Sequence, residues 1–148
     1  MRILATNKQT VTDIDIPRIK HTSDKILRTL ENEDSEISLT FVDDAGITEI
    51  NTQYLGRDYP TNVIAFSMNE GEFGNVNPNI LGDIIISTET ALRNAETEGL
   101  SLEDELDYLI IHGVLHLLGY DHELPGEAKE MREKEREIFF ALKKYHIE

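Results

Sequence analysis

Three histidines and a glycine form the pattern with the clearest chemical meaning in this 148-residue sequence. His112 and His116 are four residues apart, so on a helix their imidazoles project from the same side, one turn apart. Gly119 can adopt the left-handed conformation that ends a helix and turns the chain back, which would bring His122 toward the same point. Three imidazoles around one ion leave a fourth position for water, which is typical of a catalytic zinc site.

The spacing of the histidines is specific, and it also separates one class of enzyme from another. The sequence reproduces the H-x-x-x-H-x-x-G-x-x-H pattern of metzincin-type zinc sites. Those peptidases carry a glutamate directly after the first histidine as general base, whereas this chain has Gly113 there. We therefore expect one Zn²⁺ held by His112, His116 and His122, and peptide hydrolysis is disfavoured. Asp121 is a weaker candidate, as a carboxylate that orients an imidazole or donates a proton during catalysis.

Composition limits the other possibilities. The chain has 14 basic and 29 acidic residues, a formal net charge of −15, and no cysteine. Disulfides, thiolate metal ligands and a cysteine nucleophile are thereby excluded. No apolar run approaches the ~18 residues of a membrane span, so we expect a cytoplasmic protein. An acidic protein is a poor candidate for gripping nucleic acid through its own phosphate contacts alone. The basic residues gather in 1–28 and 129–148, and only Arg57 and Arg93 lie between.

Hydrophobic periodicity predicts a single α+β domain over residues 1–148, with a small mixed sheet of about four strands packed with about five helices. The strand-like runs are 2–5, 36–42, 62–68 and 81–87, of which the last two would form a hairpin. The helical runs are 18–33, 45–55, 88–99, 102–118 and 126–145. The run 102–118 is apolar nearly all round, which predicts a buried helix. The last helix would bury a stripe of Met131, Ile138, Phe139 and Leu142, and its alternating charges are more typical of a solvated face than of an RNA contact.

Three segments resemble the YbeY endoribonucleases, bacterial metal-dependent enzymes of ribosomal RNA maturation and ribosome quality control. HGVLHLLGYDH (112–122) is similar to the family signature, and NTQYLGRDYPTNVIAFS (51–67) and LGDIIIS (81–87) resemble two further blocks in the same order. The resemblance implies that His112, His116 and His122 bind zinc. It also implies ribosomal RNA as substrate and the ribosome or ribosomal proteins as partners.

One position departs from the family pattern. Where the family has an arginine implicated in handling RNA directly after the tyrosine, this chain has Leu55. Arg57, two residues later, is the nearest cation and a weaker candidate for holding a phosphate. Asn62 is equally a substrate contact or the entry to a strand, and Asp83 is equally a strand-end carboxylate or a residue that lines the site.

The leading hypothesis is a zinc-dependent, single-strand-specific endoribonuclease that hydrolyses phosphodiesters with a metal-bound water, because zinc lowers the pKa of such a water toward ~7. The RNA substrate comes from the resemblance and the metal from the spacing. One alternative is a ribosome-associated assembly factor with a structural metal, favoured by the acidic middle of the chain and by Leu55. Another is a zinc hydrolase of a different substrate class, such as peptides or small amides.

Overall fold

A four-stranded mixed sheet organises the computed structural model, which describes residues 3–68, 79–120 and 124–146. The strands are β1 (Ile3–Asn7), β2 (Glu36–Val42), β3 (Val63–Ser67) and β4 (Ile80–Ser87). Their order across the sheet is β1-β2-β4-β3. β1 and β4 both pair with β2 in parallel, and β3 pairs with β4 antiparallel. The predicted hairpin of the last two strands and the α+β class are confirmed.

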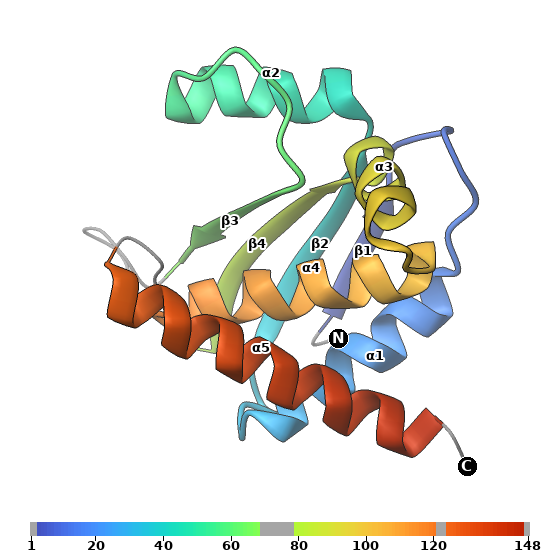
Figure 1. Ribbon diagram of the computed structural model, residues 1–148. Coiled ribbons are helices and arrows are strands. Elements are labelled where there is room, and N and C mark those ends of the chain that lie inside the picture. Colours follow the sequence, from blue (N-terminus) through green and yellow to red (C-terminus); the bar gives the residue numbers. More distant parts are fainter. Residues whose placement is uncertain (1–2, 69–78, 121–123, 147–148) are drawn as a thin grey trace.

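In the described part of the chain, five helices pack around this sheet (Figure 1). They are α1 (Ile16–Thr29), α2 (Asp44–Leu55), α3 (Thr88–Glu98), α4 (Leu102–Leu117) and α5 (Pro125–His146). The first helix is shifted toward the N-terminus relative to the prediction. Asp15 caps it by accepting a hydrogen bond from the backbone N–H of Arg18, and the chain leaves the helix before Glu31, whose φ is positive at 59°.

The two faces of the sheet are covered differently. Alternation in β2 sends Ile37, Leu39 and Phe41 into the main core, which α1, α4 and α5 complete (Figure 1). On the other face, α2 covers a small cluster with Ile47, which packs with Val42, Ile64 and Ile85. The edge strand β3 therefore lies between α4 on one face and α2 on the other.

α4 is the central helix of the main core. Ser101 caps its N-terminus by accepting a hydrogen bond from the backbone N–H of Asp104. Gly119 ends it with a φ of 101°, and the N–H of Tyr120 donates to the carbonyl of Leu115, which reverses the chain in a Schellman arrangement. The helix is buried on nearly all sides, as predicted, and so is the stripe on α5 formed by Met131, Ile138, Phe139 and Leu142.

Within the described parts of the chain, no helix is both long and apolar enough to cross a lipid bilayer.

Candidate active site

His112 and His116 project from α4 into one hollow of about 240 Å³, as their spacing predicted. We call it the histidine hollow. It lies between α4, the edge strand β3 and the C-terminal end of α2, and its lining includes Asn51, Leu55, Arg57, Phe66, His112 and His116. The structure thus brings Arg57, a residue predicted from sequence alone to contact substrate, to the two histidines. Leu55, at the position of the family arginine, lines the same hollow.

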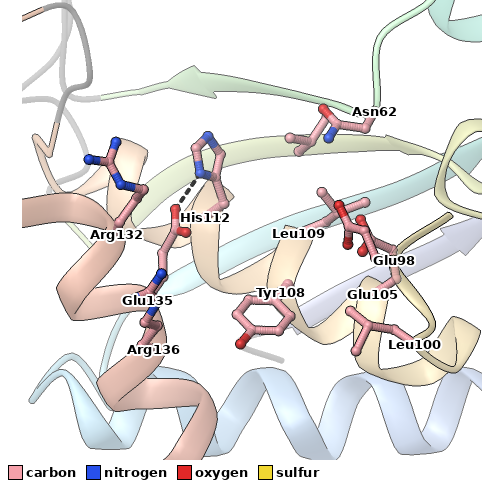
Figure 2. A pocket seen from close by; sticks show the side chains of 11 residues that line it. Asn62, Glu98, Leu100, Glu105, Tyr108, Leu109, His112, Arg132, Glu135 and Arg136 are labelled. Carbon is pink, nitrogen blue, oxygen red and sulfur yellow. Dashed lines mark hydrogen bonds and ion pairs between the residues drawn. The ribbon is translucent and has the colours of Figure 1, made fainter. Parts of the chain in front are cut away.

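The orientation of His112 is set by a glutamate on another helix. The Nδ1 of His112 lies 2.5 Å from Oε1 of Glu135 on α5 (Figure 2). Because an ionised carboxylate can only accept, Nδ1 carries the proton and the lone pair of the ring is on Nε2, the atom that a metal would bond. A carboxylate behind an imidazole is the usual arrangement at metal-binding histidines.

Glu135 was not predicted from the sequence, although its position in the last helix carries a signal. Glu135 is four residues after Met131 and three before Ile138, so it lies on the buried stripe of α5. A carboxylate on such a stripe needs a partner, because burying a charge without one is costly. The sequence therefore marks Glu135 as a carboxylate that needs a partner, and in the structure that partner is His112.

Gly113 allows α4 to lie close against the sheet beside the histidines. A Cβ at this position would be 2.9 Å from Cγ2 of Ile84 on β4 and 3.0 Å from its Cδ1. Ile84 is fully buried, so it has little freedom to move away. The position where zinc peptidases carry their glutamate therefore has no room for a side chain here.

Arg57 is held near the histidines by the end of α2. The backbone N–H of Arg57 donates to the carbonyl of Asn51 at 3.2 Å, and the hydroxyl of Thr52 donates to the carbonyl of Arg57 at 3.1 Å. The buried amide of Asn51 also donates to the carbonyl of Tyr59 at 2.8 Å. Gly56 adopts a φ of 67°, which ends α2 and turns the chain at this point. The guanidinium itself is exposed and remains able to reach a ligand.

A second and larger cavity, of about 460 Å³, adjoins the histidine hollow. We call it the α5 cavity. It lies between α4 and α5, and its lining includes Asn62, Glu98, Glu105, His112, Arg132 and Arg136 (Figure 2). Because His112 lines both spaces, they meet at that side chain. The alternating charges of α5 were interpreted from the sequence as a solvated face. In the structure, this helix contributes Arg132, Glu135 and Arg136 to the cavity that His112 lines.

Two glutamates lie together at the end of the α5 cavity away from the arginines (Figure 2). Burial raises the pKa of Glu105 to about 7, and a hydrogen bond to Glu98 and the repulsion between the two carboxylates add to that shift. The fold therefore favours the protonated form of Glu105, whose carboxyl group can donate this hydrogen bond to Glu98.

The remaining candidates are placed as follows. His122 and Asp121 lie outside the described residues, so their positions stay predictions. Within the described ranges, no three His, Asp or Glu side chains are grouped so that they could hold a metal ion. Asn62 lines the α5 cavity, whereas Asp83 lies exposed within β4 and not at its end.

The sequence of this chain matches a known protein family over most of its length. The model of the family described as Endoribonuclease YbeY matches residues 4–143. The chain belongs to this family. A protein named Endoribonuclease YbeY from Syntrophus aciditrophicus is 52% identical over 150 residues, covering 100% of this chain and 94% of that protein. The protein of the same name from Geobacter metallireducens is 47% identical and covers 97% of each chain.

The fold of the family is also shared. The solution structure of TM1509 from Thermotoga maritima matches with a TM-score of 0.64 at 27% sequence identity, covering 93% of this chain and 86% of that chain. The predictions of YbeY membership and of an endoribonuclease, a hydrolase that acts on RNA, are confirmed at the level of the family.

Proposed function

We propose that this protein is a zinc-dependent endoribonuclease that cuts single-stranded segments of ribosomal RNA in the cytoplasm, during ribosomal RNA maturation and ribosome quality control. The observation that carries the proposal is the pair His112 and His116 in one hollow, with Glu135 behind the first ring and Arg57 beside both. The endoribonuclease names of the relatives support RNA as the substrate. The ribosome or its proteins would be the partners that deliver this RNA.

The donor set fits zinc. His112 and His116 supply two imidazoles from adjacent turns of a rigid, buried helix, and His122 follows the reversal at Gly119. Imidazole nitrogens suit Zn²⁺, and the carboxylate of Glu135 would strengthen one of them. When bound, zinc would supply Lewis-acid chemistry by polarising a phosphoryl oxygen and making a water molecule more acidic.

The side chains around the histidines would position the RNA. The guanidinium of Arg57 is always charged, and its planar fork matches two oxygens of a phosphate. The contacts of Asn51 and Thr52 hold the backbone that carries it, so little ordering would remain to be done on binding. Asp121 would orient an imidazole or donate a proton to the leaving oxygen.

A purely structural metal is the second candidate, and the packing of α4 argues against it. Ile110, Ile111, Val114 and Leu115 are fully buried in the main core, so α4 is fixed in place without a metal. A structural zinc site, in contrast, supplies the folding energy of its domain. Peptide hydrolysis is disfavoured by the tight contact of Gly113 with Ile84, which leaves no space for a glutamate general base.

The test combines metal analysis with RNA cleavage. Elemental analysis of the purified chain should find about one zinc ion, and chelation should abolish cleavage of a single-stranded RNA while the far-ultraviolet circular dichroism spectrum is unchanged. Substituting His112, His116 or His122 by Ala should remove metal and cleavage together. Undiminished cleavage by the triple variant would reject the site, and unfolding on chelation would favour the structural metal.

A further inference from the structure

The α5 cavity is lined by basic side chains at one end and by acidic side chains at the other. Arg132 and Arg136 lie one turn apart on α5, near His112, while Glu98 and Glu105 lie at the other end (Figure 2). His112 and Glu105 are seven residues apart on α4, so the cavity extends along the helix for about 10 Å. A ligand that fills it should carry negative charge at one end and hydrogen-bond donors at the other.

The arginine end is available for an anion. Arg132 and Arg136 are both exposed. Among the described residues, neither has an ion-pair or hydrogen-bond partner. This contrasts with Arg18, which binds the buried Asp107, and with Arg93, which binds Asp44. Two exposed guanidinium groups that line one cavity with His112 can bind a phosphate, because each presents a planar set of N–H donors.

The glutamate end is suited to a nucleobase. Glu105 is buried and hydrogen-bonded to the more exposed Glu98, so the two carboxyl groups together offer acceptor oxygens at this end of the cavity. Leu100, Leu109 and Tyr108 supply the neighbouring apolar wall. In single-stranded RNA the bases are splayed out, packed against such side chains, and hydrogen-bonded along their Watson–Crick edges.

We infer that the α5 cavity is a nucleotide subsite, in which Arg132 and Arg136 hold a phosphate next to the cleaved bond and the pair Glu98–Glu105 accepts hydrogen bonds from the base. Guanine fits best, because its Watson–Crick edge presents two adjacent N–H donors to a carboxylate. This inference rests on the proposed cleavage of RNA at the histidine hollow, and it extends the substrate path from Arg57 past His112 to α5.

A divalent cation at Glu98 and Glu105 is the competing occupant. Two arginines in the same cavity disfavour it, since they lower the local affinity for cations. The apolar wall of Leu100, Leu109 and Tyr108 would also have no role around a hydrated cation.

The arginines are tested by direct binding, which does not depend on cleavage. The probes are fluorescent 2′-O-methyl uridine pentamers with a central G, A, C or U, bound to the zinc-loaded full chain and checked for intactness afterwards. The Arg132→Ala/Arg136→Ala variant should weaken binding of all four pentamers about tenfold. The slope of log K against log salt should become less negative by about 0.7, because each phosphate neutralised on a single strand contributes about 0.7. Lys20→Ala/Lys129→Ala removes the same charge outside both cavities and should have little effect.

The glutamates are tested with the same probes. The wild type should bind the G pentamer about tenfold more tightly than the U pentamer. Glu98→Gln/Glu105→Gln should bring the two affinities within about twofold, and the exposed pair Glu96→Gln/Glu133→Gln should leave the preference unchanged. Circular dichroism spectra and thermal melting of every variant would report on folding.

Each outcome separates the inference from the proposed function. Unchanged binding by the double arginine variant, with weakened binding by Arg57→Ala, would overturn the subsite and leave the histidine hollow intact. A G preference that persists in the Glu98→Gln/Glu105→Gln variant would also overturn it. Mn²⁺ binding that is lost in this variant, without a change in base preference, would identify a cation site instead. Failure of the wild type to cleave any RNA, despite base-dependent binding, would count against the proposed function alone.

Discussion

Glu135 on α5 and His112 on α4 are joined by a hydrogen bond of 2.5 Å. The orientation of the His112 imidazole therefore depends on two helices that are separate in the sequence. The carboxylate fixes both the tautomer and the direction of the imidazole. It also couples the packing of α5 to the candidate metal site, since Met131 and Ile138 on the same stripe anchor the helix in the core.

Replacing Glu135 by Gln should therefore weaken zinc binding. The amide retains an acceptor for the Nδ1 proton but loses the negative charge that makes the imidazole a stronger ligand, and comparable changes cost about 10- to 100-fold in metal affinity. Competition with a chromophoric chelator would measure the zinc affinity of each variant. Glu133→Gln, an exposed neighbour on the same helix, should bind zinc like the wild type. Equal affinities for Glu135→Gln and Glu133→Gln would remove Glu135 from the site.

Adding a side chain at Gly113 should destabilise the protein. The Cβ of Gly113→Ala would be 2.9 Å from Ile84, and overpacking of this kind costs about 1 to 3 kcal/mol. Gly126→Ala is the matched control, since its Cβ meets nothing within 4 Å. Urea unfolding would measure both free energies. Gly113→Ala combined with Ile84→Ala should cost less than the sum of the single variants, and strict additivity would mean that the two residues do not press on each other.

The ion pairs of Asp107 should contribute substantially to stability. Asp107 is 1% exposed on α4 and accepts from Arg18 of α1 at 3.1 Å and from Lys143 of α5 at 2.9 Å. Asp107→Ala should lower the free energy of unfolding by about 3 kcal/mol, because two partly buried cations lose a buried partner. Asp104→Ala, which removes the more exposed partner of Lys143, should cost under about 1 kcal/mol. Urea denaturation giving the same cost for both would contradict this ranking.

Restoring the family arginine at position 55 should increase activity. Leu55 is 45% exposed and lines the histidine hollow beside Arg57, so a longer cationic side chain there can reach the hollow without repacking the core. Leu55→Arg should lower KM for single-stranded RNA about tenfold, with a steeper salt dependence from the added phosphate contact. Leu55→Gln is the uncharged control. An unchanged KM for Leu55→Arg would mean that the RNA does not pass this end of the hollow.

The elements that depend on local residue spacing could be predicted from the sequence. The contacts between helices that are distant in the sequence could not. The strands, the buried α4 and the turn at Gly119 follow from hydrophobic period and backbone preference, which neighbouring residues set. The contact of Glu135 with His112 spans 23 residues and depends on how α5 crosses α4. The same holds for Arg132 and Arg136 of the α5 cavity. Acidic and basic residues alternate along α5, and this pattern does not indicate which of its charged side chains face the site.

The pair Glu98–Glu105 should make stability depend on pH in an unusual direction. The fold raises the pKa of Glu105 from 4.5 to about 7, so it favours the protonated form. The stabilisation from that proton is complete below about pH 4.5 and is lost as the pH rises through about 7, because the unfolded state releases its proton earlier. Relative to Glu105→Gln, the wild type should therefore lose about 2 kcal/mol between pH 5 and pH 8. Urea unfolding of both proteins at each pH would measure this difference, with Glu103→Gln as the control on the same helix. A difference between wild type and Glu105→Gln that stays constant with pH would show that the fold does not raise the pKa of Glu105.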